Sequence, residues 1–87
     1  MIALTIYSRP GCHLCDEMKA VLQRVAQTTT AAISIEEIDI TADPALEARY
    51  GLEIPVLVID GRKVAKYRIT AEQLMRVVRD RSGGSGG

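Results

Sequence analysis

The order of apolar and polar residues predicts alternating strands and helices along the chain. Residues 2–7 are apolar and rich in β-branched side chains, as in a strand, and Pro10 and Gly11 end this segment. A helix follows, since apolar residues then recur at the spacing of one helix face. These residues are Leu14, Met18, Val21, Leu22 and Val25. Because the β-branched threonines at 28–30 disfavour a helix, we expect it to end there.

The second predicted strand lies within residues 32–40, and its apolar pattern is irregular. Ile33 and Ile35 share one parity, whereas Ile38 and Ile40 share the other. Since the side chains of a strand alternate between its two faces, this change predicts either a β-bulge or a late start of the strand.

The second half of the chain predicts a short helix, a hairpin and a last helix. Residues 44–50 predict the short helix, because an aspartate N-cap precedes them, proline begins them and glycine follows them. Residues 56–59 are all apolar, as in a strand buried on both faces. Asp-Gly at 60–61 predicts a tight turn into a strand over 62–67, and Thr-Ala-Glu-Gln at 70–73 is a capping box. The apolar face of the last helix consists of Ala71, Leu74, Met75 and Val78.

This order, β-α-β-α-β-β-α, predicts an α/β fold with a four-stranded mixed sheet. A right-handed crossover makes the first two strands parallel, and the tight turn makes the last two antiparallel. The apolar helix stripes and the all-apolar third strand require helices on both faces of the sheet. We predict one domain over residues 1–81, followed by a flexible Gly/Ser tail at 82–87 that has no apolar side chain.

With 87 residues, of which 47% are hydrophobic and 25% charged, the composition is ordinary for a soluble domain with one core. No basic start precedes an apolar stretch, so we expect no signal peptide, and no apolar run approaches the ~20 residues of a membrane span. Two cysteines do not make a secreted disulfide scaffold. We therefore expect a cytoplasmic, monomeric protein without a membrane partner.

The net charge is zero, but the charges are unevenly distributed. Residues 36–60 hold seven acids and one base, whereas residues 62–81 hold seven bases and two acids. These segments form either two solvated faces of opposite sign, or a basic patch suited to an anionic small molecule or an acidic partner. Three tyrosines are the only aromatic residues, so we expect no nucleic-acid binding.

The only two cysteines, Cys12 and Cys15, are three positions apart where the first predicted strand meets the first helix. Residues at this spacing on a helix lie about 5–6 Å apart, within the ~4.4–6.8 Å Cα separation of ordinary disulfides. A helix that begins near Cys12 places its sulfur beside unpaired N–H groups, which favour a thiolate. Cys15, one turn inside, is more shielded. We predict a redox-active pair in which Cys12 attacks a disulfide and Cys15 resolves the mixed disulfide.

The two residues between the cysteines are candidates for tuning this chemistry. Protonated His13 adds positive charge near the thiolate and makes the disulfide more oxidising; alternatively, His13 is an exposed loop residue without a role in titration. Leu14 either offers a substrate an apolar contact at the mouth of the site or belongs to the core.

A metal site is the competing interpretation of the cysteines. Tetrahedral zinc takes four ligands, and this chain offers two cysteines and one adjacent histidine. A metal ion or iron–sulfur cluster would need a site shared between chains or completed by an external thiol. We predict no metal and no bound cofactor, and keep two alternatives: a non-enzymatic metal-binding or iron–sulfur module, and a redox-inactive scaffold.

Ile54 and Pro55 directly precede the apolar strand at 56–59. Proline cannot donate a hydrogen bond to a sheet, so it belongs at a strand start. The peptide bond before Pro55 is either trans or cis. A cis bond would expose the backbone of Ile54, which would then pair with a substrate segment as an added strand.

Together these segments resemble the glutaredoxin branch of the thioredoxin fold. Residues 7–15, Tyr-Ser-Arg-Pro-Gly-Cys-His-Leu-Cys, are similar to the glutaredoxin active-site segment, and residues 54–57, Ile-Pro-Val-Leu, to its cis-proline motif. The resemblance covers residues 2 to about 80. It implies a thioredoxin-like fold with Cys12 as nucleophile and Pro55 as the cis proline, and it implies that Arg9 contacts the glycyl carboxylate of glutathione.

The chain departs from the glutaredoxin pattern at two places. Glu53 stands where glutaredoxins usually have threonine, and residues 66–70 stand where they have Gly-Gly-x-Asp. In that segment, Arg68 would pair with a carboxylate, and Thr70 would bind one through the free N–H groups of the helix start. We predict a thiol–disulfide oxidoreductase that reduces protein or glutathione mixed disulfides. Its partners would be disulfide-containing client proteins and an external donor, either glutathione or a thioredoxin-reductase-type donor.

Overall fold

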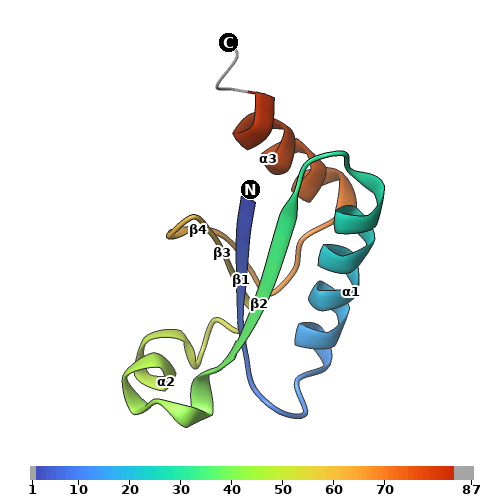
Figure 1. Cartoon of the computed structure of the whole chain (residues 1–87). Coiled ribbons are helices and arrows are strands. Elements are labelled where there is room, and N and C mark those ends of the chain that lie inside the picture. The colour runs from blue at the N-terminus through green and yellow to red at the C-terminus, as the bar shows by residue number, and fades with distance from the viewer. Residues whose placement is uncertain (1, 84–87) are drawn as a thin grey trace.

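The computed structural model describes residues 2–83 and contains a four-stranded mixed sheet with helices on both faces (Figure 1). The strands are β1 (Ile2–Ser8), β2 (Ile33–Asp39), β3 (Val56–Ile59) and β4 (Arg62–Lys66). The helices are α1 (His13–Thr28), the 3-10 helix η1 (Ile40–Ala42), α2 (Pro44–Tyr50) and α3 (Ala71–Gly83). This order confirms the predicted β-α-β-α-β-β-α arrangement and adds η1 to it.

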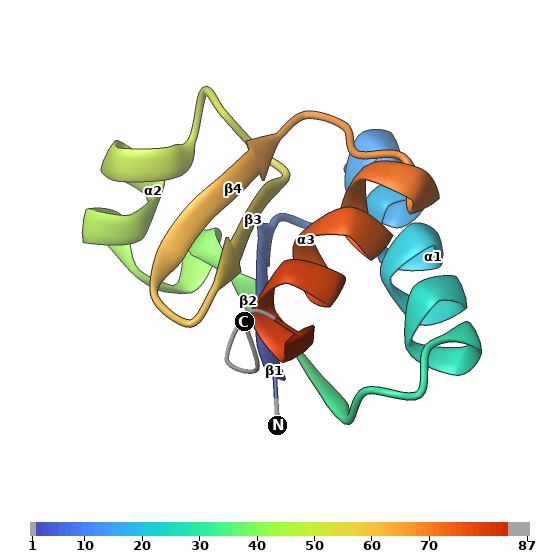
Figure 2. The same cartoon turned by 90° about the horizontal axis from the view of Figure 1, so that it is seen from above.

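The strands pair in the order β2-β1-β3-β4, so β2 and β4 form the two edges of the sheet. β1 is parallel to β2 and antiparallel to β3, and β3 is antiparallel to β4. α1 and α3 pack side by side against one face, and α2 lies on the other (Figure 2). The crossover through α1 makes β1 and β2 parallel neighbours, as predicted.

Two apolar clusters fill the spaces between the sheet and its helices. The larger cluster, beneath α1 and α3, consists of Ile2, Leu4, Ile6, Met18, Leu22, Val25, Leu57, Ile59, Ile69, Leu74 and Val78. The smaller cluster, on the α2 face, consists of Ile40, Tyr50, Val56 and Val58. Because successive residues of β3 belong to different clusters and all four are buried, the predicted strand with two buried faces is confirmed.

The register of β2 is regular, so the predicted β-bulge or late strand start is wrong. Residues 33–39 pair with β1 in unbroken sequence. Ile33 packs against the larger cluster, whereas Ile40, seven positions later and of opposite parity, is buried in the smaller cluster. The apolar residues change face because different helices cover the two ends of this strand.

The predicted turn and capping box both form. Asp60 and Gly61 have φ angles of 50° and 84°, in the left-handed region that a type I′ hairpin turn requires. At the start of α3, the N–H of Gln73 donates to Thr70 Oγ1, and the N–H of Thr70 donates to Gln73 Oε1, both at 3.0 Å. These local signals therefore determine where β4 and α3 begin.

The last helix extends past the domain end expected at residue 81. α3 continues to Gly83, and the rest of the expected tail, residues 84–87, lies outside the described residues. Among the helices of residues 2–83, none is both long and apolar enough to cross a membrane.

The loops that carry the candidate chemistry meet at one end of the sheet. β1 ends at Ser8, and the chain then passes through residues 9–12 into α1. Val56, the first residue of β3, pairs with Tyr7 on one side and with Lys66 of β4 on the other. The topology thus brings the cysteine loop, the segment before β3 and the end of β4 to the same end.

Candidate redox site

Cys12 is the N-cap residue of α1. Its backbone is extended, with φ −86° and ψ 110°, and Gly11 before it has a φ of 77°, which favours glycine. Cys12 Sγ accepts a hydrogen bond from the backbone N–H of Cys15 at 3.1 Å. The sulfur therefore takes the place of an N-cap oxygen and satisfies an otherwise unpaired N–H of the first turn.

Cys12 and Cys15 form a disulfide, with their Cα atoms 5.2 Å apart. This separation lies within the ~4.4–6.8 Å of ordinary disulfides, so the pair closes across one helical turn without moving the backbone. In the reduced pair, the same N–H groups and the helix dipole favour the thiolate of Cys12. The spacing at the start of α1 therefore allows the two sulfurs to bond within one chain.

The two sulfurs differ in their access to solvent. Cys15 is only 1% exposed, whereas Cys12 is half-buried at the start of the helix. A sulfur must be reachable to attack an external disulfide, and reactive cysteines are partly exposed whereas buried ones are inert. Cys12 is therefore the more accessible of the two sulfurs.

His13 and Leu14 lie in the first turn of α1, between the cysteines. The side chain of His13 is exposed, and that of Leu14 is half-buried. Asp16 is the acidic residue of this turn, in a position that stabilises a helix N-terminus. Solvent thus reaches both residues that separate Cys12 from Cys15.

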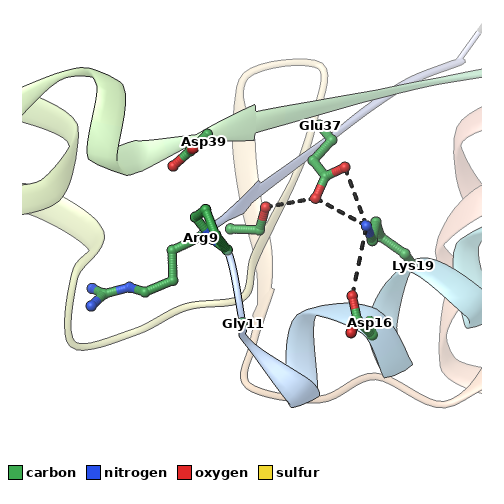
Figure 3. Close-up of a pocket in the computed structure, with 8 residues that line it drawn as sticks. Arg9, Gly11, Asp16, Lys19, Glu37 and Asp39 are labelled. Carbon is green, nitrogen blue, oxygen red and sulfur yellow. Dashed lines mark hydrogen bonds and ion pairs between the residues drawn. The ribbon is translucent and has the colours of Figure 1, made fainter.

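Arg9 lies in the loop before Cys12, and its side chain points toward the residue that ends α2 (Figure 3). Arg9 Nη2 donates a hydrogen bond to the carbonyl oxygen of Gly51 at 3.1 Å. Arg9 Nε is buried and has no hydrogen-bond partner within the described residues. The guanidinium therefore connects the cysteine loop to the end of α2, a contact that sequence reasoning missed because it joins residues far apart in the chain.

The Ile54–Pro55 peptide bond is cis. Pro55 is buried directly before β3, and its carbonyl oxygen accepts a hydrogen bond from the N–H of Tyr67 at 2.8 Å. The hydroxyl of Tyr67 donates to the carbonyl oxygen of Leu52 at 2.9 Å. Tyr67, which follows β4, thus holds the segment before β3 at two points, and the sequence carries no local signal for this.

Arg68 and Thr70 lie in the segment between β4 and α3. Both line a pocket of about 190 Å³ that Glu17 and Val21 of α1 complete. Arg68 is exposed, whereas the N–H and the hydroxyl of Thr70 are both engaged by Gln73. The structure therefore places these two predicted residues beside the helix that carries Cys15, with Thr70 already hydrogen-bonded within the chain.

Another pocket, of about 300 Å³, lies beside the loop before Cys12 (Figure 3). It is lined by Ser8, Arg9, Pro10, Gly11, Asp16, Lys19, Glu37 and Asp39. Glu37 accepts a hydrogen bond from the hydroxyl of Ser8 at 2.8 Å and pairs with Lys19 Nζ at 3.1 Å. These contacts connect the carboxyl ends of β1 and β2 to the first turns of α1.

The polar groups of this pocket influence one another. The Ser8 hydroxyl and, to a smaller extent, Lys19 hold the pKa of Glu37 below its ordinary value. The hydroxyl and N–H of Thr41 likewise lower the pKa of Asp39. Ser8 is only 3% exposed, so its hydroxyl needs an acceptor inside the protein. The alternation of side chains along a strand was the sequence signal for this contact, since Ser8 and Glu37 both fall on positions whose side chains face the core.

Metal-ligating side chains do not gather in sets of three within residues 2–83. The disulfide pair offers two sulfur ligands, where tetrahedral zinc takes four. A metal ion at Cys12 and Cys15 would therefore need ligands from a second chain or from an external thiol, as the sequence already indicates.

Comparison with known proteins identifies the family. Residues 3–79 match the family described as the glutaredoxin-like domain (DUF836). A glutaredoxin-like protein from Dictyostelium discoideum (YDR286C homolog) is 30% identical over 77 residues, which cover 84% of this chain and 71% of that protein. The target protein XcR50 from X. campestris, known from an X-ray structure, is 34% identical, with a TM-score of 0.71 over 86% of this chain and 93% of that one.

A more distant structure agrees in fold. The crystal structure of chloroplastic thioredoxin z is 18% identical, with a TM-score of 0.78 over 97% of this chain and 80% of that chain. This likeness concerns the fold alone, and it confirms the predicted thioredoxin-like fold. The fold and the Cys12–Cys15 pair fit a thiol oxidoreductase. Since the family match spans almost the whole described chain, the protein belongs to the glutaredoxin-like domain family.

Proposed function

We propose that this chain is a thiol–disulfide oxidoreductase that reduces protein disulfides or glutathione mixed disulfides through Cys12 and Cys15. The observation that carries the proposal is the N-cap position of Cys12, whose Sγ accepts the N–H of Cys15 at 3.1 Å. Donors that hydrogen-bond the charged form of a group favour that form, and the thiolate is the attacking species. Cys15 is buried one turn further along α1, where it meets only a partner already bound to Cys12.

The reaction moves two electrons from the dithiol to the client disulfide. The Cys12 thiolate attacks one client sulfur; a Cys12–client disulfide forms, the client S–S bond breaks, and the other client sulfur leaves as a thiolate that takes up a proton. The Cys15 thiolate then attacks Cys12 Sγ, forms the intramolecular disulfide and releases the second client thiolate, which is also protonated. The client gains two electrons and two protons, and the dithiol loses the same number.

An external thiol donor returns the protein to its reduced state. Glutathione and a thioredoxin-reductase-type donor are the two candidates, and two observations favour the second. Arg9 donates to Gly51, and both polar groups of Thr70 are engaged by Gln73. Arg9, which the family resemblance assigns to glutathione, and Thr70, which the helix start predicts to bind a carboxylate, thus already have partners within the chain. A cytoplasmic, reducing environment suits this cycle because it keeps thiols reduced.

The client would lie against the exposed surface around the disulfide. The backbone of Ile54 precedes β3 at the same end of the sheet as Cys12, and it would pair with an extended client segment. His13 and Leu14, both accessible to solvent, would line the entry to the cysteines. Client proteins are thus bound through main-chain hydrogen bonds as well as through the reacting sulfur.

Single cysteine variants test the roles of the two sulfurs. We expect Cys12→Ser to abolish the reduction of a disulfide-containing protein such as insulin, because no exposed thiolate remains. We expect Cys15→Ser to form the first bond and then accumulate a mixed disulfide through Cys12, because no resolving thiol is left. Mass spectrometry of the intact adducts, before and after a reductant is added, identifies the sulfur that is bound.

The double variant Cys12→Ser/Cys15→Ser is the matched control for adducts that do not involve these cysteines. Activity retained in Cys12→Ser, or an adduct formed through Cys15 in the presence of Cys12, would contradict the assignment. A coloured dimer after anaerobic purification would instead favour the shared metal or iron–sulfur module.

A further inference from the structure

The charged residues are unevenly distributed over the elements of the fold. The acid-rich residues 36–60 include part of edge strand β2 and all of α2, whereas the base-rich residues 62–81 include edge strand β4 and most of α3. β2 and β4 are the opposite edges of the sheet (Figure 2). The two segments nevertheless meet, because Glu53 pairs with Lys63 and Asp60 pairs with Arg81, and only the basic residues outside these pairs are available to a partner.

A groove of about 330 Å³ lies between β4 and α3 on the basic side. Its apolar lining includes the half-buried side chains of Val64, Ala65 and Val77. Its cations are the exposed side chains of Lys66, Arg68 and Arg76. We call this site the cationic groove.

Ion pairs within the chain do not engage the cations of the cationic groove, although Lys66, after Lys63, contributes to lowering the pKa of Glu53, and its Nζ lies 5.6 Å from the centre of the Tyr67 ring. No carboxylate lines the groove, and Lys66, Arg68 and Arg76 form no ion pair with any residue of the described part of the chain. Lys63, also on β4, is different, because it pairs with Glu53 at 2.7 Å. Three unpaired cations around apolar surface attract an anionic partner that also has apolar groups.

The cationic groove leads to the redox end of the molecule. Arg68 lines both this groove and the pocket that Glu17 and Val21 of α1 complete. Tyr67, the residue before Arg68, donates its N–H to the carbonyl oxygen of Pro55. A chain that lies along the groove therefore continues toward the helix that carries Cys15 and toward the segment before β3.

Protection of an exposed edge strand does not account for all three cations. Lysines on edge strands oppose pairing between sheets of different molecules, and Lys66 is placed for that purpose. Arg68 and Arg76, however, lie outside β4, in the following segment and on α3. Their convergence on one groove needs another explanation.

We propose that the cationic groove binds an extended, acidic segment of the client protein whose disulfide Cys12 attacks. The inference rests on the proposed oxidoreductase function and specifies which clients the protein takes. Client carboxylates pair with the guanidinium groups of Arg68 and Arg76 and with the ammonium group of Lys66. Apolar client side chains between them cover the apolar lining. Such complementary charges speed encounter and set the register in which the client disulfide meets Cys12.

Peptides with the same internal disulfide, flanked by glutamates, glutamines or lysines, test the groove. At low ionic strength we expect the second-order rate constant for the glutamate peptide to exceed that for the glutamine peptide by about tenfold, with the lysine peptide slower than both. The preference should disappear in ~1 M salt, where charges are screened beyond about 3 Å.

A pair of charge-reversal variants separates the groove from the net charge. Arg68→Glu/Arg76→Glu reverses two groove cations, and Arg24→Glu/Arg79→Glu makes the same change in net charge at exposed positions outside the groove. Each rate is divided by the same variant's rate with bis(2-hydroxyethyl) disulfide, a small uncharged disulfide, so that effects on the cysteines cancel. We expect the groove variant to prefer the lysine peptide and the control to keep the preference for the glutamate peptide.

Three outcomes would overturn the proposal. They are equal relative rates for all three peptides, an equal loss of preference in the control variant, and self-association of the wild-type chain that the groove variant abolishes. Fluorescence anisotropy with glutamate peptides that carry serines in place of cysteines measures binding without chemistry. Binding that depends on Arg68 and Arg76, in a protein that reduces no disulfide, would support the groove and contradict the oxidoreductase function.

Discussion

Cys12 and Cys15 have identical side chains, and their surroundings differ because of their positions relative to the start of α1. Cys12 precedes the helix, and its sulfur accepts an N–H of the first turn. Cys15 is inside the helix and is buried. Unpaired N–H groups and the positive end of the helix dipole act only over the first turn.

Glu37 connects the protonation of one residue to the stability of the fold. The Ser8 hydroxyl and Lys19 hold the pKa of Glu37 below its ordinary value. A carboxyl group with a lowered pKa stabilises the fold above its unfolded pKa, and this stabilisation is lost as the pH falls through the folded pKa. We therefore expect the melting temperature of Glu37→Gln to fall less than that of the wild type between pH ~5 and pH ~3. Circular dichroism measures the melting temperature of each protein at each pH.

Glu36→Gln is the matched control, because Glu36 is the exposed neighbour whose side chain alternates to the opposite face of β2. Since Glu37 is largely exposed, we expect the two variants to differ at neutral pH by at most about 1 kcal/mol in the free energy of unfolding. Parallel pH profiles for the two variants would mean that the contacts of Glu37 do not link stability to pH.

Among the elements, the connection from β4 to α3 also positions the segment before β3. Tyr67 has a φ of 69°, and such a conformation costs a residue other than glycine roughly 1–3 kcal/mol. Its N–H and hydroxyl donate to Pro55 and Leu52, respectively. These two hydrogen bonds offset the strained backbone and hold the segment before β3 against the end of β4.

Tyr67→Phe tests this connection by removing only the hydroxyl. We expect the free energy of unfolding to fall by about 0.5–1.5 kcal/mol, the usual net value of one hydrogen bond, and the amides of residues 52–54 to exchange faster with solvent. Urea unfolding and hydrogen exchange measure the two effects. Tyr7→Phe is the control, since Tyr7 stacks on Tyr50 through its ring and phenylalanine keeps that ring. Equal exchange in the two variants would show that the Tyr67 hydroxyl does not hold the segment.

At the scale of the whole molecule, the candidate redox site lies beside an uneven distribution of charged residues. β2 and β4 form the two edges of the sheet, and the disulfide lies at one end of the sheet. An approaching partner therefore meets the cations of the cationic groove on the β4 side of this site. Under the proposed function, the charges of the whole surface therefore influence which client and which electron donor bind.

At the scale of the whole molecule, we make a prediction about the electron donor. Because Arg9 and Thr70 are engaged within the chain, we expect glutathione to reduce the disulfide no faster than 2-mercaptoethanol does, after correction for thiol pKa. A thioredoxin-reductase system should reduce it faster than either monothiol. Stopped-flow kinetics with the oxidised protein measures all three rates. Reduction by glutathione at least tenfold faster than by the simple monothiol would instead reveal a glutathione site.

Local signals in the sequence predicted most of the fold. The Asp60-Gly61 turn, the capping box of α3 and the helix stripe from Leu14 to Val25 each depend on residues within a few positions of one another. Residues 56–59 likewise predicted a strand, because a strand that is buried on both faces is apolar throughout. For β2 the prediction failed, since its pattern depends on which helix covers each end of the strand.

The order of the elements, the resemblance to the family and the position of the cysteine pair could all be predicted from the sequence, because N-caps, turns and a Cys-x-x-Cys at a helix start act through nearby residues. Tertiary structure alone decided that Ser8, Glu37 and Lys19 meet, that Arg9 reaches Gly51 and that a cationic groove forms between β4 and α3. These contacts join residues far apart in the chain. They exist only after the sheet has set its register and the helices have packed on it.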